Sequence, residues 1–98
     1  MEKGTAHYKL RQLKDMLAAG KMKMTYVAYV GAAQMNLDWE GVRDILLHLE
    51  PADFYKSMTT YQDHRVWQDV YRPATRYGGL YVKLTITDKV LVVSFKPR

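Results

Sequence analysis

The chain has 98 residues, of which 48% are hydrophobic, and it contains no cysteine. This length allows a single domain over residues 1–98, because two cores would leave each half too small to offset its chain entropy. The lack of cysteine excludes disulfides, thiol nucleophiles and thiolate zinc sites. No apolar run approaches the roughly 20 residues of a membrane-spanning helix, and no signal peptide is visible, so we expect a cytoplasmic protein without a membrane partner.

Charge is distributed unevenly along the chain, which carries a net charge of +5. Residues 1–24 contain six cationic and two acidic side chains. Residues 54–98 contain eight cationic and three acidic side chains. Residues 25–53 contain one cationic and five acidic side chains. A basic balance of this kind favours an anionic partner without naming one.

Two helices are expected first along the chain. One covers His7–Ala19, where apolar residues recur on one face and Gly20 follows as a left-handed stop. The next begins with Thr25 as its N-cap and continues to about Met35. Its apolar stripe consists of Tyr26, Val30 and Ala33.

A third helix is expected from Asp38, which is a favourable N-cap, until Pro51 prevents continuation. Apolar residues recur within it at helical spacing. They are Trp39, Val42, Ile45, Leu46 and Leu49.

After Phe54 the hydrophobic period changes from about 3.6 to 2, and aromatic and β-branched residues become frequent. Four strands are predicted, over Tyr55–Tyr61, Val66–Arg72, Leu80–Thr87 and Val90–Lys96. The connections between them are short and favour consecutive antiparallel pairing. They are Gln62–Arg65, Pro73–Gly79 and the turn Asp88-Lys89. The predicted fold is therefore α+β with two layers, in which N-terminal helices pack on a C-terminal antiparallel sheet of about four strands.

The third predicted strand indicates which face of the sheet meets the helices. Its apolar set, which should face the helices, is Leu80, Val82, Leu84 and Ile86. Its outward set is Tyr81, Lys83, Thr85 and Thr87. An outward face that carries polar and cationic side chains is a plausible seat for a phosphate chain.

The residue types that can bind metals are scattered along the chain and form no cluster. No histidine belongs to an i, i+4 pair or a carboxylate cluster, and the three are His7, His48 and His64. The C-terminal half has too few acidic residues for a two-metal nuclease centre, namely Asp63, Asp69 and Asp88. We expect no metal and no other cofactor.

A mixture of Lys, Arg, Tyr and Gln on strands suits RNA cleavage without metal. The 2′-hydroxyl of RNA can attack the adjacent phosphate, so the protein needs only to remove that proton, stabilise phosphate charge and protonate the departing 5′-oxygen. Clustered cations can lower the pKa of a lysine until it acts as a base. Composition alone does not choose the base, since such side chains are more often simply solvated, and strand aromatics serve packing more often than base stacking.

One run of 21 residues carries a family resemblance. Residues 53–73 read DFYKSMTTYQDHRVWQDVYRP, and this run resembles the MqsR family of toxins. The similarity continues through residues 81–83 and 90–96 and includes Met1-Glu2-Lys3, Thr5 and His7. It is dense from Asp53 onward and sparse from Tyr8 to Glu50.

The resemblance implies a RelE-like fold and a ribosome-independent mRNA interferase that favours GCU-like sites. It also implies a partner antitoxin that binds zinc through one domain and DNA through another, so that DNA is contacted only indirectly. The family's functional residues fall on Lys56, Gln68 and Tyr81, with Lys96 as a fourth.

The sequence leaves the roles of these four residues interchangeable. Lys56 is a base or a phosphate contact, Tyr81 donates a proton or orients the phosphate, Gln68 positions the substrate, and Lys96 stabilises charge. A second set is expected to bind RNA, with His64 as an alternative acid: Arg72, His64, Lys83 and Tyr55.

Two other classes of function stay open. The chain could be a catalytically inactive module that binds RNA or serves as a co-repressor through contact with the antitoxin. Direct DNA binding is less favoured, because no predicted helix is both exposed and markedly basic along one face.

Overall fold

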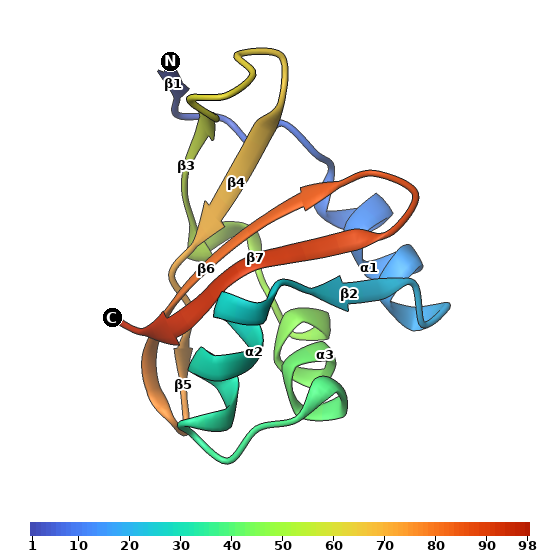
Figure 1. Ribbon diagram of the computed structural model, residues 1–98, viewed down its shortest axis with the longest axis vertical. Coiled ribbons are helices and arrows are strands. Elements are labelled where there is room, and N and C mark those ends of the chain that lie inside the picture. The colour runs from blue at the N-terminus through green and yellow to red at the C-terminus, as the bar shows by residue number, and fades with distance from the viewer.

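The computed structural model describes residues 1–98 and confirms a mixed α+β fold (Figure 1). The helical elements are α1 (Leu10–Ala18), α2 (Tyr26–Ala33), α3 (Trp39–Leu47) and a 3-10 turn, η1 (Pro51–Asp53). The strands are β1 (Glu2–Lys3), β2 (Met22–Met24), β3 (Phe54–Thr59), β4 (Trp67–Tyr71), β5 (Ala74–Thr75), β6 (Gly78–Ile86) and β7 (Val90–Pro97). No helix has the length and apolar character needed to cross a membrane.

The sheet has seven strands, so the prediction of about four was wrong. Its order is β1-β3-β4-β6-β7-β2, and β5 pairs beside β6. The consecutive antiparallel pairing of the four predicted strands, β3, β4, β6 and β7, is confirmed. The sheet is not wholly antiparallel, because β2 runs parallel to β7. The three additional strands have only two or three residues each, which is too short for a recognisable alternation of apolar and polar residues.

The expected helix signals are confirmed in atomic detail. The Thr25 hydroxyl accepts a hydrogen bond from the backbone N–H of Ala28 at 3.1 Å and caps α2. The Asp38 carboxylate accepts from the N–H of Gly41 at 2.9 Å and caps α3. Gly20, which follows α1, adopts a φ of 76°.

The first helix begins at Leu10 rather than at His7. The cause lies in Asp69 of β4, whose buried carboxylate accepts hydrogen bonds from the backbone N–H groups of His7 and Tyr8, both at 3.0 Å. These contacts tie His7 and Tyr8 to the sheet before the helix starts. The helical period in the sequence therefore extended past the true N-terminus of the helix.

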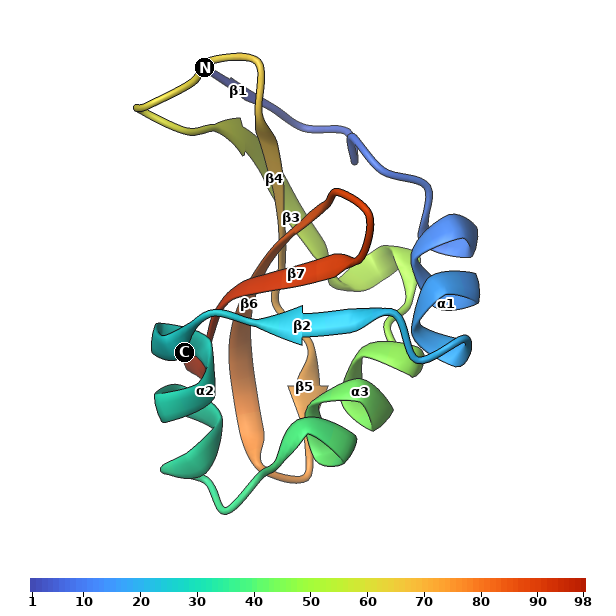
Figure 2. The same cartoon turned by 45° about the vertical axis from the view of Figure 1, so that its right-hand side comes forward.

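All three helices lie against one face of a twisted sheet (Figure 2). The core combines helix residues such as Leu17 and Leu46 with Val82, Leu84 and Phe95 of the sheet, all of them buried. Ile86 packs against this cluster, which confirms the predicted inward set of β6.

Helix α2 presents the opposite stripe from the one expected. Ala28 and Ala32 are buried, whereas Tyr26 is 80% exposed. Gly31 lies so close to β7 that an added Cβ would overlap the backbone carbonyl of Phe95. Small residues therefore set the contact, and of the predicted stripe Tyr26 and Ala33 are exposed while Val30 is half-buried.

Thr85 also departs from the prediction, since it was expected to face solvent and is buried. The last residue pair between β4 and β6 is Asp69 with Leu84. Beyond it the Thr85 hydroxyl donates to the backbone oxygen of Trp67 at 2.8 Å and lies 3.0 Å from the Tyr8 hydroxyl. The N-terminal segment thus covers this end of β6.

Candidate active site

A row of cross-strand partners crosses the sheet on the face away from the helices. Lys56 of β3 pairs with Val70 of β4, Val70 pairs with Lys83 of β6, and Lys83 pairs with Ser94 of β7. Directly paired residues project to the same face. Val70 is fully buried, yet it is not part of the helix-side core cluster. Its burial therefore comes from this opposite face, where the two lysines flank it.

The next positions extend the cationic character of this face. Tyr81 pairs with Lys96, whose ammonium lies 5.3 Å from the centre of the Tyr81 ring. Gln68 and Arg72 alternate with Val70 along the β4 segment and so project to the same side. A polar and cationic outer face is therefore present, with Thr85 as the exception already described.

A bulge places one more aromatic ring here. The register of β3 against β4 shifts between Phe54 and Lys56, so Tyr55 has no partner across the strand pair. Its side chain is 48% exposed. The Arg72 guanidinium lies 4.6 Å from the centre of this ring, and the Lys56 ammonium lies 5.4 Å from it. Both cations are thus held beside an accessible aromatic surface.

These groups surround an open hollow of about 440 Å³ at the C-terminal end of β7. Three of its lining side chains are cationic and none is acidic. The lining residues are Tyr55, Arg72, Tyr81, Lys96, Pro97 and Arg98. A concave surface with one sign of charge attracts a phosphate chain, and the two tyrosines offer faces for nucleobases.

Lys56 is held beside the hollow by an ion pair that the sequence did not suggest. Its ammonium donates to a carboxylate oxygen of Glu2, on the neighbouring strand β1, at 2.8 Å. This hydrogen bond is the main cause that raises the pKa of Lys56 above its usual value and lowers the pKa of Glu2. The expectation that crowded cations lower the pKa of a lysine here is therefore not met for Lys56, which stays protonated.

The structure brings together most of the residues chosen from sequence. Five of them cluster around the hollow: Tyr55, Lys56, Arg72, Tyr81 and Lys96. Gln68 and Lys83 lie on the same face, whereas His64 lies apart on the β3–β4 loop and lines a second hollow of about 190 Å³ with Glu2. Glu2 and Arg98 were missed, because nothing local in the sequence indicates that the two ends of the chain reach this face.

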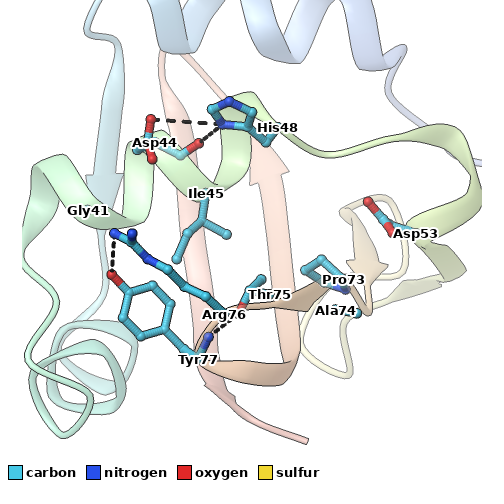
Figure 3. Close-up of a pocket in the computed structure, with 10 residues that line it drawn as sticks. All are labelled: Gly41, Asp44, Ile45, His48, Asp53, Pro73, Ala74, Thr75, Arg76 and Tyr77. Carbon is cyan, nitrogen blue, oxygen red and sulfur yellow. Dashed lines mark hydrogen bonds and ion pairs between the residues drawn. The ribbon is translucent and has the colours of Figure 1, made fainter.

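Another pocket, of about 390 Å³, lies between α3 and the β5 segment (Figure 3). Its walls include two carboxylates, Asp44 and Asp53, which oppose the binding of a polyanion. The guanidinium of Arg76 is engaged by the Tyr77 hydroxyl at 3.1 Å, and His48 contacts the backbone oxygen of Asp44 at 2.8 Å. No group of three or more His, Asp or Glu side chains is spaced to hold a metal ion. The outer sheet face is therefore the better seat for a nucleic acid.

Comparison with known proteins identifies the family of the chain. The family model described as "Motility quorum-sensing regulator, toxin of MqsA" matches residues 5–97. The mRNA interferase toxin MqsR of Escherichia coli (strain K12) is 46% identical over 98 residues, which cover 100% of both chains. The chain therefore belongs to the MqsR toxin family.

Proposed function

We propose that this protein is an endoribonuclease toxin that cleaves single-stranded mRNA without a metal ion or the ribosome. The observation that carries the proposal is the cationic hollow beside Tyr55 and Tyr81 on the open face of the sheet. Membership of a family whose relative is named an mRNA interferase toxin supports the same activity.

The reaction we propose is attack of the RNA's own 2′-hydroxyl on the adjacent phosphate. As the 2′-oxygen bonds to phosphorus, negative charge grows on the phosphate oxygens, and the bond to the 5′-oxygen then breaks. Lys56, Arg72 and Lys96 can stabilise that charge, because all three lie on the face that would hold the phosphate. Arginine keeps its charge throughout, and the ion pair with Glu2 keeps Lys56 protonated.

The remaining site residues take the roles that their chemistry allows. Lys56 is a phosphate contact in this proposal rather than the base, since a protonated ammonium cannot accept a proton. Tyr81, paired with Lys96, orients the phosphate or donates the proton to the departing oxygen. Gln68 positions the substrate from the adjacent strand, and the exposed ring of Tyr55 supplies a stacking surface.

The proposal also includes features that the family resemblance implies. These are cleavage at GCU-like sites and a RelE-like arrangement of the sheet. Action on mRNA also fits the cytoplasmic location expected from the sequence. The partner is an MqsA-like antitoxin that binds zinc and DNA, so that this chain reaches DNA only through it. The family description, which names a toxin of MqsA, supports the antitoxin partner.

Cleavage of a defined RNA by the purified chain tests the proposed function. The assay contains excess EDTA and no ribosomes, and a DNA oligonucleotide of the same sequence serves as the comparison substrate. We expect cleavage of RNA alone, and a loss of about 100-fold or more in Lys56→Ala. Lys89→Ala is the matched control, because Lys89 is an exposed lysine in the β6–β7 turn.

Two results would contradict the proposal. Normal cleavage by Lys56→Ala would show that the site is misplaced. Tight RNA binding without turnover by folded wild-type protein would favour the alternative, a catalytically inactive RNA-binding or co-repressor module, because the same cationic face can bind RNA without cutting it.

A further inference from the structure

Glu2 is the acidic side chain of the outer sheet face beside the proposed site. It lines the hollow that contains Tyr55 and Lys56, and also the separate hollow that contains His64. No other lining residue of these two hollows, or of the cationic hollow, is acidic. The proposed reaction needs a proton acceptor, and the protonated Lys56 does not supply one.

The backbone holds Glu2 in this position. Strand β1 pairs with β3 so that Glu2 faces Met58 and Lys3 faces Ser57. The Thr59 N–H donates to the Met1 oxygen at 2.9 Å at the end of this pairing. Since Met58 is two residues from Lys56 on one strand, the register places Glu2 and Lys56 on the same face.

The N-terminal segment that carries Glu2 is also anchored on the helix side of the sheet. The Lys3 ammonium lies 4.1 Å from the centre of the Trp67 ring, and the His7 ring stacks on Trp67 with centroids 5.4 Å apart. Asp69 binds the backbone of His7 and Tyr8. The position of Glu2 is thus fixed by contacts on both sides of the sheet.

The carboxylate is charged and accessible. One oxygen of Glu2 accepts from Lys56 at 2.8 Å, and the side chain as a whole is 57% exposed. Its pKa lies below the usual value, mainly because of that hydrogen bond. A substrate phosphate that contacts Lys56 competes for the ammonium, weakens its hold on the carboxylate and so makes Glu2 a better proton acceptor.

We propose that Glu2 is the general base of this site, a role that rests on the proposed ribonuclease function. Its carboxylate takes the proton of the 2′-hydroxyl while the 2′-oxygen bonds to phosphorus. The phosphorus–5′-oxygen bond breaks, the departing oxygen takes a proton from an acid for which Tyr81 is the candidate, and a 2′,3′-cyclic phosphate forms. Water then carries the proton from Glu2 back to that acid, and the charges balance.

The competing interpretation is that Glu2 only occupies Lys56 in place of a phosphate. The two interpretations predict opposite effects of Glu2→Gln, which keeps the shape and removes the charge. A general base predicts that the single-turnover rate falls about 100-fold or more, while RNA binding is unchanged or tighter because a negative charge is lost. If Glu2 instead only occupies Lys56 in place of a phosphate, Glu2→Gln frees Lys56 for the substrate and cleavage becomes faster.

The experiment measures single-turnover cleavage and RNA affinity across a range of pH. We expect wild type to show a rise in rate with pH on the acidic side that Glu2→Gln lacks. Glu2→Ala should recover part of its rate when formate is added, because formate restores a carboxylate in the space that alanine leaves. Glu40→Gln is the matched control, since Glu40 lies on α3, is 73% exposed and is paired with Arg43.

Each outcome decides the matter. An unchanged or faster rate in Glu2→Gln, or a slow Glu2→Ala that formate does not restore, overturns the assignment of Glu2 and leaves the ribonuclease function intact. Absence of cleavage by wild type itself overturns the proposed function together with this assignment. The assignment of Glu2 as the general base is supported if Glu2→Ala melts at the wild-type temperature and recovers part of its cleavage rate in formate.

Discussion

Val70 and Lys83 are direct cross-strand partners on the outer face of the sheet, and Val70 is nevertheless fully buried. The aliphatic stems of long cationic side chains can cover apolar surface while their charged ends stay in water. Because Lys56 is the partner on the other side of Val70, a single apolar side chain supports two cations of the proposed site. Stability and function are therefore linked at this position.

Replacement of Val70 by alanine should lower both properties. The lost methyl groups and the cavity left behind should reduce the free energy of unfolding by about 1–3 kcal/mol. RNA cleavage should fall as well, because the stems of Lys56 and Lys83 lose their support. Urea unfolding and the cleavage assay measure the two effects.

Val27→Ala is the control for this change, because Val27 lies on α2 and is 66% exposed. Its effect on stability should stay within about 0.5 kcal/mol. An equally small effect of Val70→Ala on stability would show that Val70 is not packed as the structure has it.

Asp69 links the N-terminal segment to the sheet, so Asp69→Ala should release that segment. Two N–H groups that make partly buried hydrogen bonds, those of His7 and Tyr8, would lose their acceptor, at a cost of about 1–3 kcal/mol for each group that stays unpaired and shielded from water. Hydrogen exchange should show faster exchange at both amides. Cleavage should also slow, because the same segment positions Glu2.

Asp15→Ala removes an exposed carboxylate of α1 and provides the comparison. Its exchange pattern at His7 and Tyr8 should match that of wild type. Protection of those two amides that survived in Asp69→Ala would contradict the role given to Asp69.

Tyr71 should make stability depend on pH in the alkaline range. Burial raises the pKa of its hydroxyl from 10.0 to about 12, and the charges of Asp69 and Asp53 add to the rise. Because the folded state holds this proton more tightly than the unfolded state, the contribution is fully present below pH 10 and is lost as the pH rises through about 12.

Urea unfolding at a series of pH values, in wild type and in Tyr71→Phe, isolates this contribution. Between pH 10 and 12 the free energy of unfolding should fall more steeply in wild type, since phenylalanine has no proton to lose. Equal slopes in the two proteins would mean that the Tyr71 hydroxyl is not buried in the folded state.

The sequence predicted the elements whose signals are local. Capping by Thr25 and Asp38 is confirmed, as is the pairing order of the four longer strands. Strands β1 and β2 could not be predicted, because their two or three residues become strands only through pairing with β3 and β7. The late start of α1 has the same kind of cause, a contact with Asp69 from far along the chain.

The residues of the site also differ in whether local sequence signals or distant contacts place them. Alternation along the β6 segment predicted that Tyr81 and Lys83 face outward, whereas Lys56, Gln68 and Lys96 were chosen from the family resemblance. The register of the strands then places Lys56, Tyr81 and Lys96 on one face. Glu2 was not predicted, since its place beside Lys56 depends on a two-residue strand. Of the two roles left open for Lys56, the base with a lowered pKa does not fit for that reason, because the hydrogen bond with Glu2 raises the pKa of Lys56.

The proposed reaction depends on the 2′-hydroxyl of the RNA, and a single 2′-deoxy nucleotide on the 5′ side of the scissile phosphate removes that group. We expect the all-RNA strand to be cut at this phosphate and to leave a 2′,3′-cyclic phosphate, whereas the substituted strand stays intact there. Cleavage of the substituted strand at the normal rate would show that the 2′-hydroxyl does not attack, because the nucleophile would then have to come from outside the RNA.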